Sequence, residues 1–131
     1  MISLTKLKAY LSVNDVTAGQ SKYYPDLSPL TLQQPRDRIL KNVRKAFRAG
    51  GSGWTIEKYA PEEARLEGTV TTPVFGFVDD FEVWLEPVNQ EPETWRIVAR
   101  SQSRVGRGDF GKNARNIRSF YQRLREIQSE D

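Results

Sequence analysis

The chain of 131 residues contains neither cysteine nor histidine. Without cysteine it can form no disulfide, and it offers no thiolate nucleophile and no sulfur ligand for zinc or an iron–sulfur cluster. Without histidine it lacks the commonest general base near neutral pH and the commonest metal ligand. A catalytic centre of the Ser-His-Asp or Cys-His kind is therefore impossible within this chain, whereas a Mg²⁺ or Ca²⁺ site made of oxygen ligands stays open.

Long hydrophobic runs are also missing from the sequence. The first eleven residues, MISLTKLKAYL, contain no apolar run long enough for the core of a secretory signal. Nowhere do about 18 apolar residues follow one another, so we expect no membrane-spanning helix. The sequence predicts a soluble protein of a reducing compartment, the cytoplasm or the equivalent plastid stroma in a phototroph, and it leaves peripheral contact with a membrane open.

The charges nearly balance but are unevenly distributed. The chain has 20 Lys+Arg and 17 Asp+Glu, a net charge of +3. Ten acidic residues and two basic ones fall between positions 57 and 93, whereas residues 100–125 contain eight basic residues and one acidic one. Such segregation indicates either a basic surface for an acidic partner or acidic strands neutralised by basic helices inside one fold. We favour the second interpretation.

The apolar spacing predicts an α+β fold. Residues 35–49 and 111–128 have helical periodicity, and Pro35 suits the first helical position. Strand-like alternation covers four segments: residues 54–59, 64–72, 77–87 and 95–104. We therefore expect a domain over residues 31–131, with a four-stranded antiparallel sheet and two helices packed on one face. Residues 1–30 are predicted to precede it as an extended N-terminal arm.

The last two predicted strands suggest a register. If Val83 faces Ile97, then Asp80 lies opposite Arg100 on the exposed face, and Asp79 faces Ser101 on the core side. The same register places Trp84 opposite Arg96 as a cation–π pair. A core-side carboxylate at Asp79 would need hydrogen-bond partners.

The polar residues with the most information lie in two stretches, GFVDDFE at 76–82 and RSQSRVGRGDFGKNAR at 100–115. The second stretch passes from a strand through a glycine-rich loop to a helix N-terminus, where backbone N–H groups and arginines can hold an anion. The candidate ligand-binding residues are Arg100, Ser101, Ser103, Arg104, Gly106, Asp109, Gly111, Asn113 and Arg115.

A structural interpretation of the same stretch competes with anion binding. Asp109 would cap the helix, Ser103 and Asn113 would satisfy the loop backbone, and the arginines would pair with acidic residues of the preceding strand. Those acidic residues, which form a structural ion pair or support the site, are Asp79, Asp80 and Glu82. The G-x-G-x-x-G pattern at 106–111 lacks the parallel βαβ unit of a dinucleotide site, and Lys112-Asn113 departs from a P-loop.

Three other functions receive less support from the residues. Asp79, Asp80 and Glu82 could serve a small carboxylate-dependent enzyme, but alternation separates Asp79 from the other two, and we assign no catalytic residue, metal or cofactor. Nucleic-acid binding by the basic helices is a further alternative that we do not expect, because their charges spread around the helix and no stacking array accompanies them. The oligomeric state cannot be predicted.

The motifs resemble a known family. The elements Gly-Phe-x-Asp-Asp at 76–80 and Arg-Ser-x-Ser-Arg-x-Gly-x-x-Asp-x-Gly-x-Asn at 100–113, followed by Arg115, are similar to those of the domain of unknown function family numbered 1499. Tyr24-Pro25-Asp26-Leu27 and Asn14-Asp15-Val16-Thr17 extend the resemblance to about residues 14–125, and Phe110 departs from the usual aliphatic residue. The resemblance implies members in cyanobacteria, proteobacteria and plastids but no reaction. We therefore expect an accessory or binding protein that recognises an acidic protein or a small anionic ligand through the Arg100–Asn113 corner.

Overall fold

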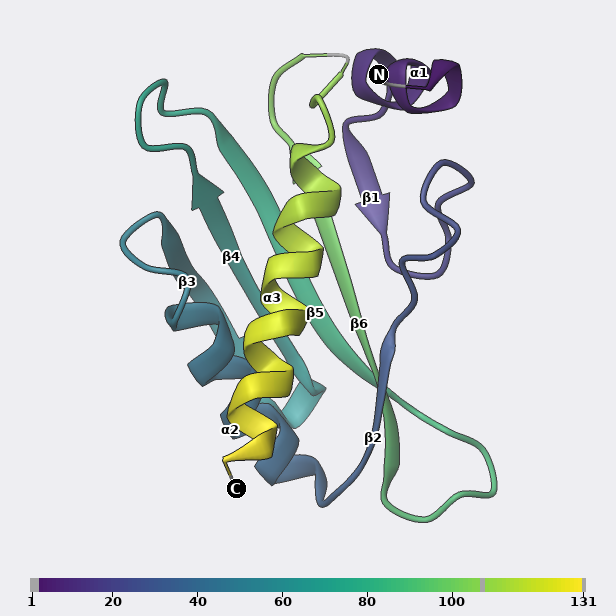
Figure 1. The fold of residues 1–131 in the computed structure, drawn as a ribbon. Helices are drawn as coiled ribbons and strands as arrows, with labels where there is room; N and C mark the ends of the chain where they lie inside the picture. Colours follow the sequence, from purple (N-terminus) through teal and green to yellow (C-terminus); the bar gives the residue numbers. More distant parts are fainter. Residues whose placement is uncertain (1–2, 107, 131) are drawn as a thin grey trace.

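The computed structural model describes residues 3–106 and 108–130 (Figure 1). Its elements, in chain order, are helix α1 (Leu4–Ser12), strands β1 (Asp15–Thr17) and β2 (Leu30–Gln33), helix α2 (Arg36–Arg48), strand β3 (Trp54–Ala60), the 3₁₀ turn η1 (Pro61–Glu63), strands β4 (Arg65–Thr71), β5 (Val78–Pro87) and β6 (Thr94–Ser103), and helix α3 (Lys112–Ser129). The α+β class is confirmed. No described helix combines the length and apolar character needed to cross a membrane.

The sheet is antiparallel and contains six strands, so the prediction of four is wrong. Strands β3 to β6 pair in chain order, and the free edge of β6 then binds β1 along residues 100–102 and β2 along residues 94–97. The N-terminal arm is therefore not extended throughout. Its strands are only three and four residues long, too short to show alternation, and α1 precedes them.

Helices α2 and α3 cover one face of the sheet, as predicted (Figure 1). The core lies between these layers, where Phe81 of β5 packs against Phe47 of α2 and Phe120 of α3 with ring centroids 5.7 and 5.5 Å apart. All three rings are fully buried. Pro35 takes the N-cap position of α2 rather than the first helical position.

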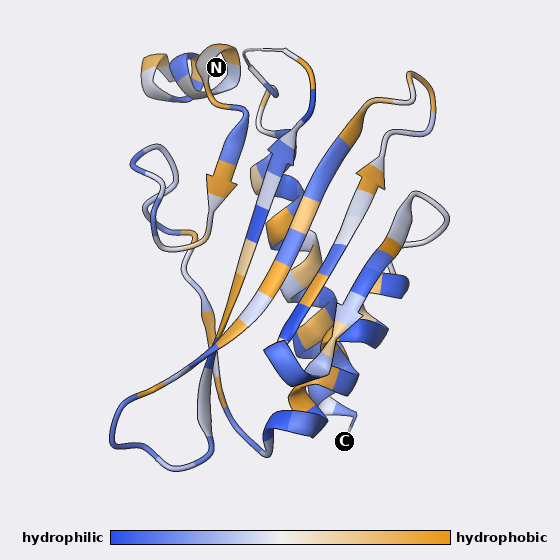
Figure 2. Cartoon of the chain, turned by 180° about the vertical axis from the view of Figure 1, so that it is seen from behind, coloured by the Kyte–Doolittle hydropathy of each residue, from blue (hydrophilic) through white to orange (hydrophobic). Residues whose placement is uncertain are grey.

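No α-helix of the described residues covers the opposite face of the sheet (Figure 2). Ion pairs run across this face: Arg65 contacts Glu67 and Glu82, and Arg96 lies 3.5 Å from Glu86. The acidic strands are thus neutralised to a large extent by arginines of the sheet itself, and less by the helices than we expected.

The side chain of Tyr121 on α3 forms hydrogen bonds with the backbone of β6 at the strand's edge. Strands β1 and β2 leave a gap between them along this edge. The buried Tyr121 hydroxyl donates to the carbonyl of Ile97 at 2.7 Å and accepts from the N–H of Ala99 at 3.1 Å. Burial raises the pKa of this phenol above its ordinary value.

Candidate functional site

The predicted register between β5 and β6 is wrong by two residues, although the two faces are correct. Glu82 lies opposite Arg100, and Asp80 lies opposite Gln102. A shift of two residues preserves alternation, so Asp79 still points to the core side, and its cross-strand neighbour is Ser103 instead of Ser101. The expected pair of Trp84 with Arg96 is replaced by Arg65, whose guanidinium lies 5.3 Å from the Trp84 ring centroid.

Asn113, at the start of α3, is the centre of a buried polar network. Its side-chain N–H group donates to Asp109 Oδ2 at 2.7 Å, to Ser103 Oγ at 2.9 Å and to the carbonyl of Asn14 at 3.1 Å. Its amide oxygen accepts from Ser101 Oγ at 2.5 Å. One completely buried side chain thereby joins β6, α3 and the turn before β1.

Asp109 occupies the N-terminus of α3. Its carboxylate accepts hydrogen bonds from the N–H groups of Gly111 at 2.8 Å and of Asn113 at 3.1 Å. Gly111, at the N-cap position, has φ of +80°, a left-handed conformation that favours glycine. The predicted N-cap position of Asp109 is wrong, because Gly111 occupies it, but the carboxylate accepts backbone N–H bonds at the start of α3 as expected. It thereby takes N–H groups that an external anion would otherwise use.

The described arginines of the corner bind partners within the chain. Arg100 forms a bidentate pair with Asp15 at 2.6 and 2.9 Å, and Arg104 lies 2.9 Å from Asp80. Hydrogen bonding to these carboxylates raises the pKa of both guanidinium groups. Arg115 donates to the carbonyl of Phe110 at 2.8 Å.

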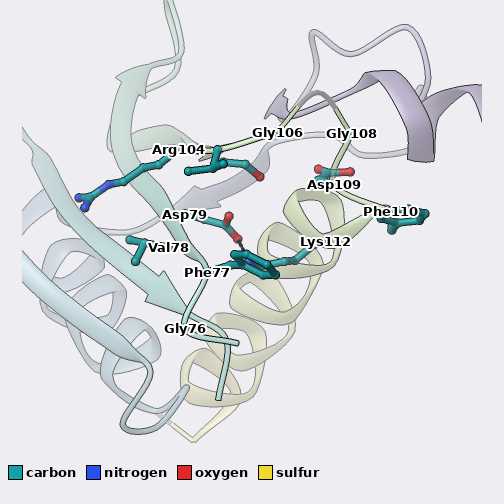
Figure 3. A pocket seen from close by; sticks show the side chains of 12 residues that line it. Gly76, Phe77, Val78, Asp79, Arg104, Gly106, Gly108, Asp109, Phe110 and Lys112 are labelled. Atoms are coloured by element: carbon teal, nitrogen blue, oxygen red, sulfur yellow. Dashed lines mark ion pairs between the residues drawn. The ribbon is translucent and has the colours of Figure 1, made fainter. Parts of the chain in front are cut away.

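A cavity of about 460 Å³ lies between the β4–β5 loop and the β6–α3 loop (Figure 3). This volume is within the range of small-molecule sites. Four of the predicted ligand-binding residues line it: Ser103, Arg104, Gly106 and Asp109. The other five, outside its lining, are Arg100, Ser101, Gly111, Asn113 and Arg115. Its apolar walls come from Phe77, Val78, Val105 and Phe110.

The base of the cavity holds an ion pair between Asp79 and Lys112 (Figure 3). Lys112 Nζ lies 3.0 Å from Asp79 Oδ2, and Asn116 Nδ2 donates to the same oxygen at 2.8 Å. Asp79 is 1% exposed, and its other oxygen, Oδ1, is buried without a hydrogen-bond partner. Sequence reasoning placed Asp79 on the core side but did not identify Lys112, because the helix packing that brings Lys112 to it has no signature in the sequence.

The three carboxylates of the β5 motif do not converge. Asp80 and Glu82 alternate with Asp79 and pair with arginines of the open face, Asp80 with Arg104 and Glu82 with Arg65. In residues 3–106 and 108–130, no group of three or more aspartate and glutamate side chains is arranged to hold a metal ion. Among the charged residues that line the cavity, Asp109 is engaged by N–H groups at the start of α3 and Arg104 pairs with Asp80. The Asp79–Lys112 pair and the apolar walls are therefore the groups that a ligand would meet.

Comparison with known proteins adds an identity at the level of the family. No curated protein shows significant similarity to the chain. The family model described as a protein of unknown function (DUF1499) matches residues 7–124, which include both polar motifs and the cavity, and the chain therefore belongs to this family.

Proposed function

We propose that the protein binds a small amphipathic anion in the cavity between the β4–β5 and β6–α3 loops. The anionic head group accepts a hydrogen bond from Lys112, and the apolar part of the ligand lies against Phe77, Val105 and Phe110. The observation that carries this proposal is the Asp79–Lys112 pair at the base of an apolar-walled cavity.

A desolvated ion pair is weak evidence for stability, because the loss of hydration offsets much of the attraction; here Asp79 is buried, whereas the Lys112 side chain is 18% exposed. Here the pair is also incompletely hydrogen-bonded, since Asp79 Oδ1 has no partner. A lysine ammonium group has three N–H donors, and Asp79 engages one of them. The unpaired Asp79 Oδ1 is an acceptor and would need a hydrogen-bond donor, so the anionic head group of the ligand addresses Lys112 and not Asp79.

The arrangement supports a small ligand more than an acidic protein. Arg100 and Arg104, the arginines of the Arg100–Asn113 corner expected to meet an acidic partner, already pair with Asp15 and Asp80. The cavity, in contrast, offers an ammonium group among apolar side chains, which suits one charged group on a hydrophobic body.

Calorimetric titration with octanoate, octanol and octylammonium tests the head group while the alkyl chain stays constant. We expect octanoate to bind most tightly, and Lys112→Met to lower its affinity to that of octanol. The matched control is Lys41→Met, which removes the same charge from the exposed surface of α2, outside the cavity. Phe110→Ala, at an exposed wall residue, should weaken octanoate and octanol alike.

Two results would overturn the proposal. One is octylammonium binding as tightly as octanoate, since a cation would pair with Asp79 instead of Lys112. The other is the absence of binding by all three probes to wild-type protein. Circular dichroism of Lys112→Met checks that the variant folds, and Phe110→Ala keeps the test informative if it does not.

A further inference from the structure

The exposed large hydrophobic side chains of the described residues gather in three segments. These are α1, the β4–β5 loop at residues 72–77, and the β6–α3 loop at residues 104–111. We call these side chains the apolar tip; they are Leu4, Leu7, Leu11, Val74, Phe75, Phe77, Val105 and Phe110. Val74 and Phe75 are 84% and 77% exposed, so residues 3–106 and 108–130 leave most of both side chains uncovered.

The three segments lie at the same end of the molecule (Figures 1 and 2). The N–H of Phe110 donates to the carbonyl of Tyr10 at 3.0 Å, which joins the β6–α3 loop to α1. Lys112 at the start of α3 lies 6.0 Å from the Phe77 ring centroid, which brings the β4–β5 loop close to the same loop. Phe75 and Phe77 stack with centroids 5.8 Å apart. The apolar side chains thus project from one end rather than from scattered sites.

The charges differ between the two ends. At the tip, residues 3–11 contain Lys6 and Lys8 and no acidic residue, and residues 72–78 contain no charged residue. Asp109 is the acidic residue of the β6–α3 loop, and it is buried as the helix cap. At the opposite end, η1 and the β5–β6 loop present exposed acidic residues: Glu62, Glu63, Glu91 and Glu93. Two basic residues lie beside η1, since Lys58 pairs with Glu63 and Arg36 donates to the carbonyl of Pro61.

We propose that the apolar tip docks the protein on the surface of a lipid bilayer that carries anionic head groups. Exposed apolar and aromatic side chains flanked by lysines are characteristic of interfacial membrane binding, and Leu4, Leu7 and Leu11 follow a helical spacing on α1. Basic residues near such a surface are attracted by its negative potential. Lys6 and Lys8 therefore favour an orientation with the tip toward the lipid.

Cosedimentation with vesicles tests the docking. Wild-type protein should sediment with vesicles of phosphatidylcholine and phosphatidylglycerol, and less with pure phosphatidylcholine. Val74→Ser/Phe75→Ser should lower the partition coefficient at least about tenfold, because burial of one large apolar side chain is worth that factor or more. Neither residue lines the cavity, so this variant should keep its octanoate affinity.

A pair of matched charge variants tests the orientation. Lys6→Glu/Lys8→Glu should abolish binding to the anionic vesicles, whereas Lys41→Glu/Lys45→Glu on α2 makes the same change in net charge away from the tip and should leave most of the binding. Docking is refuted if wild-type protein stays in the supernatant with anionic vesicles, or if Val74→Ser/Phe75→Ser sediments as wild type does. Octanoate binding without vesicle binding would refute docking alone, and the reverse result would refute the cavity proposal alone.

Discussion

Replacement of Asn113 by alanine should destabilise the protein strongly. Its side chain bridges Asp109, Ser103, the carbonyl of Asn14 and Ser101 while it is completely buried. The Asn14 carbonyl and Asp109 each keep another hydrogen bond, from the N–H groups of Ser103 and Gly111. The Ser101 hydroxyl loses its acceptor and the Ser103 hydroxyl loses a donor. Each buried group left without its partner lowers the free energy of unfolding by about 1–3 kcal/mol.

We therefore expect Asn113→Ala to lower the free energy of unfolding by about 3 kcal/mol, which corresponds to a fall in Tm of roughly 10 °C for a domain of this length. Urea unfolding followed by tryptophan fluorescence measures the change. Asn89→Ala, in the exposed β5–β6 loop, is the matched control and should stay within about 0.5 kcal/mol of wild type. A loss below about 1 kcal/mol for Asn113→Ala would refute the role of the network.

Asn113→Asp separates hydrogen bonding from packing, because it keeps the shape of the side chain. A carboxylate oxygen would replace the amide nitrogen that lies 2.7 Å from Asp109 Oδ2. Repulsion between the two carboxylates should make this variant less stable than Asn113→Ala at neutral pH. Its stability relative to wild type should recover as the pH falls and the new carboxyl takes up a proton.

Two further predictions concern Tyr121 and Gly108. Because burial raises the pKa of Tyr121, the unfolded chain releases this proton first, and the contribution to stability is complete below about pH 10 and is lost as the pH rises beyond it. At neutral pH, Tyr121→Phe should lower the free energy of unfolding by about 2–4 kcal/mol, because the Ile97 carbonyl and the Ala99 N–H lose their partner. In denaturant titrations above about pH 10, the free energy of unfolding should fall less steeply with pH for Tyr121→Phe than for wild type, and equal slopes would contradict this. A Cβ on Gly108 would lie 2.3 Å from the carbonyl oxygen of Tyr10, so Gly108→Ala should displace α1 and speed tryptic cleavage at Lys6 and Lys8 several-fold; an unchanged cleavage rate would contradict the contact.

The long elements could be predicted from the sequence because their apolar residues repeat with one clear period. Strands β3 to β6 and helices α2 and α3 begin and end within one or two residues of the predicted positions. The face of Asp79 also followed from alternation alone. The prediction of the β5–β6 register was wrong because every shift by two residues leaves the alternation unchanged. The geometry of the β5–β6 loop decides which of these registers forms.

The remaining features depend on contacts between distant segments. Strands β1 and β2 exist as strands because β6 pairs with them, and nothing in three or four residues predicts that partner. Lys112 approaches Asp79 only after α3 packs on the sheet. The role of Asp109 was predictable because a cap depends on residues two to four positions away.

The pairing of β1 with β6 also affects the order in which the chain can fold. Asp15 pairs with Gln102, so β1 leaves the ribosome well before β6, the strand that it pairs with. Contacts of such long sequence separation raise the contact order and slow folding. Strands β3 to β6 pair in chain order, so we expect this meander to form first with α2. We expect α1, whose backbone contacts the β6–α3 loop, to dock later.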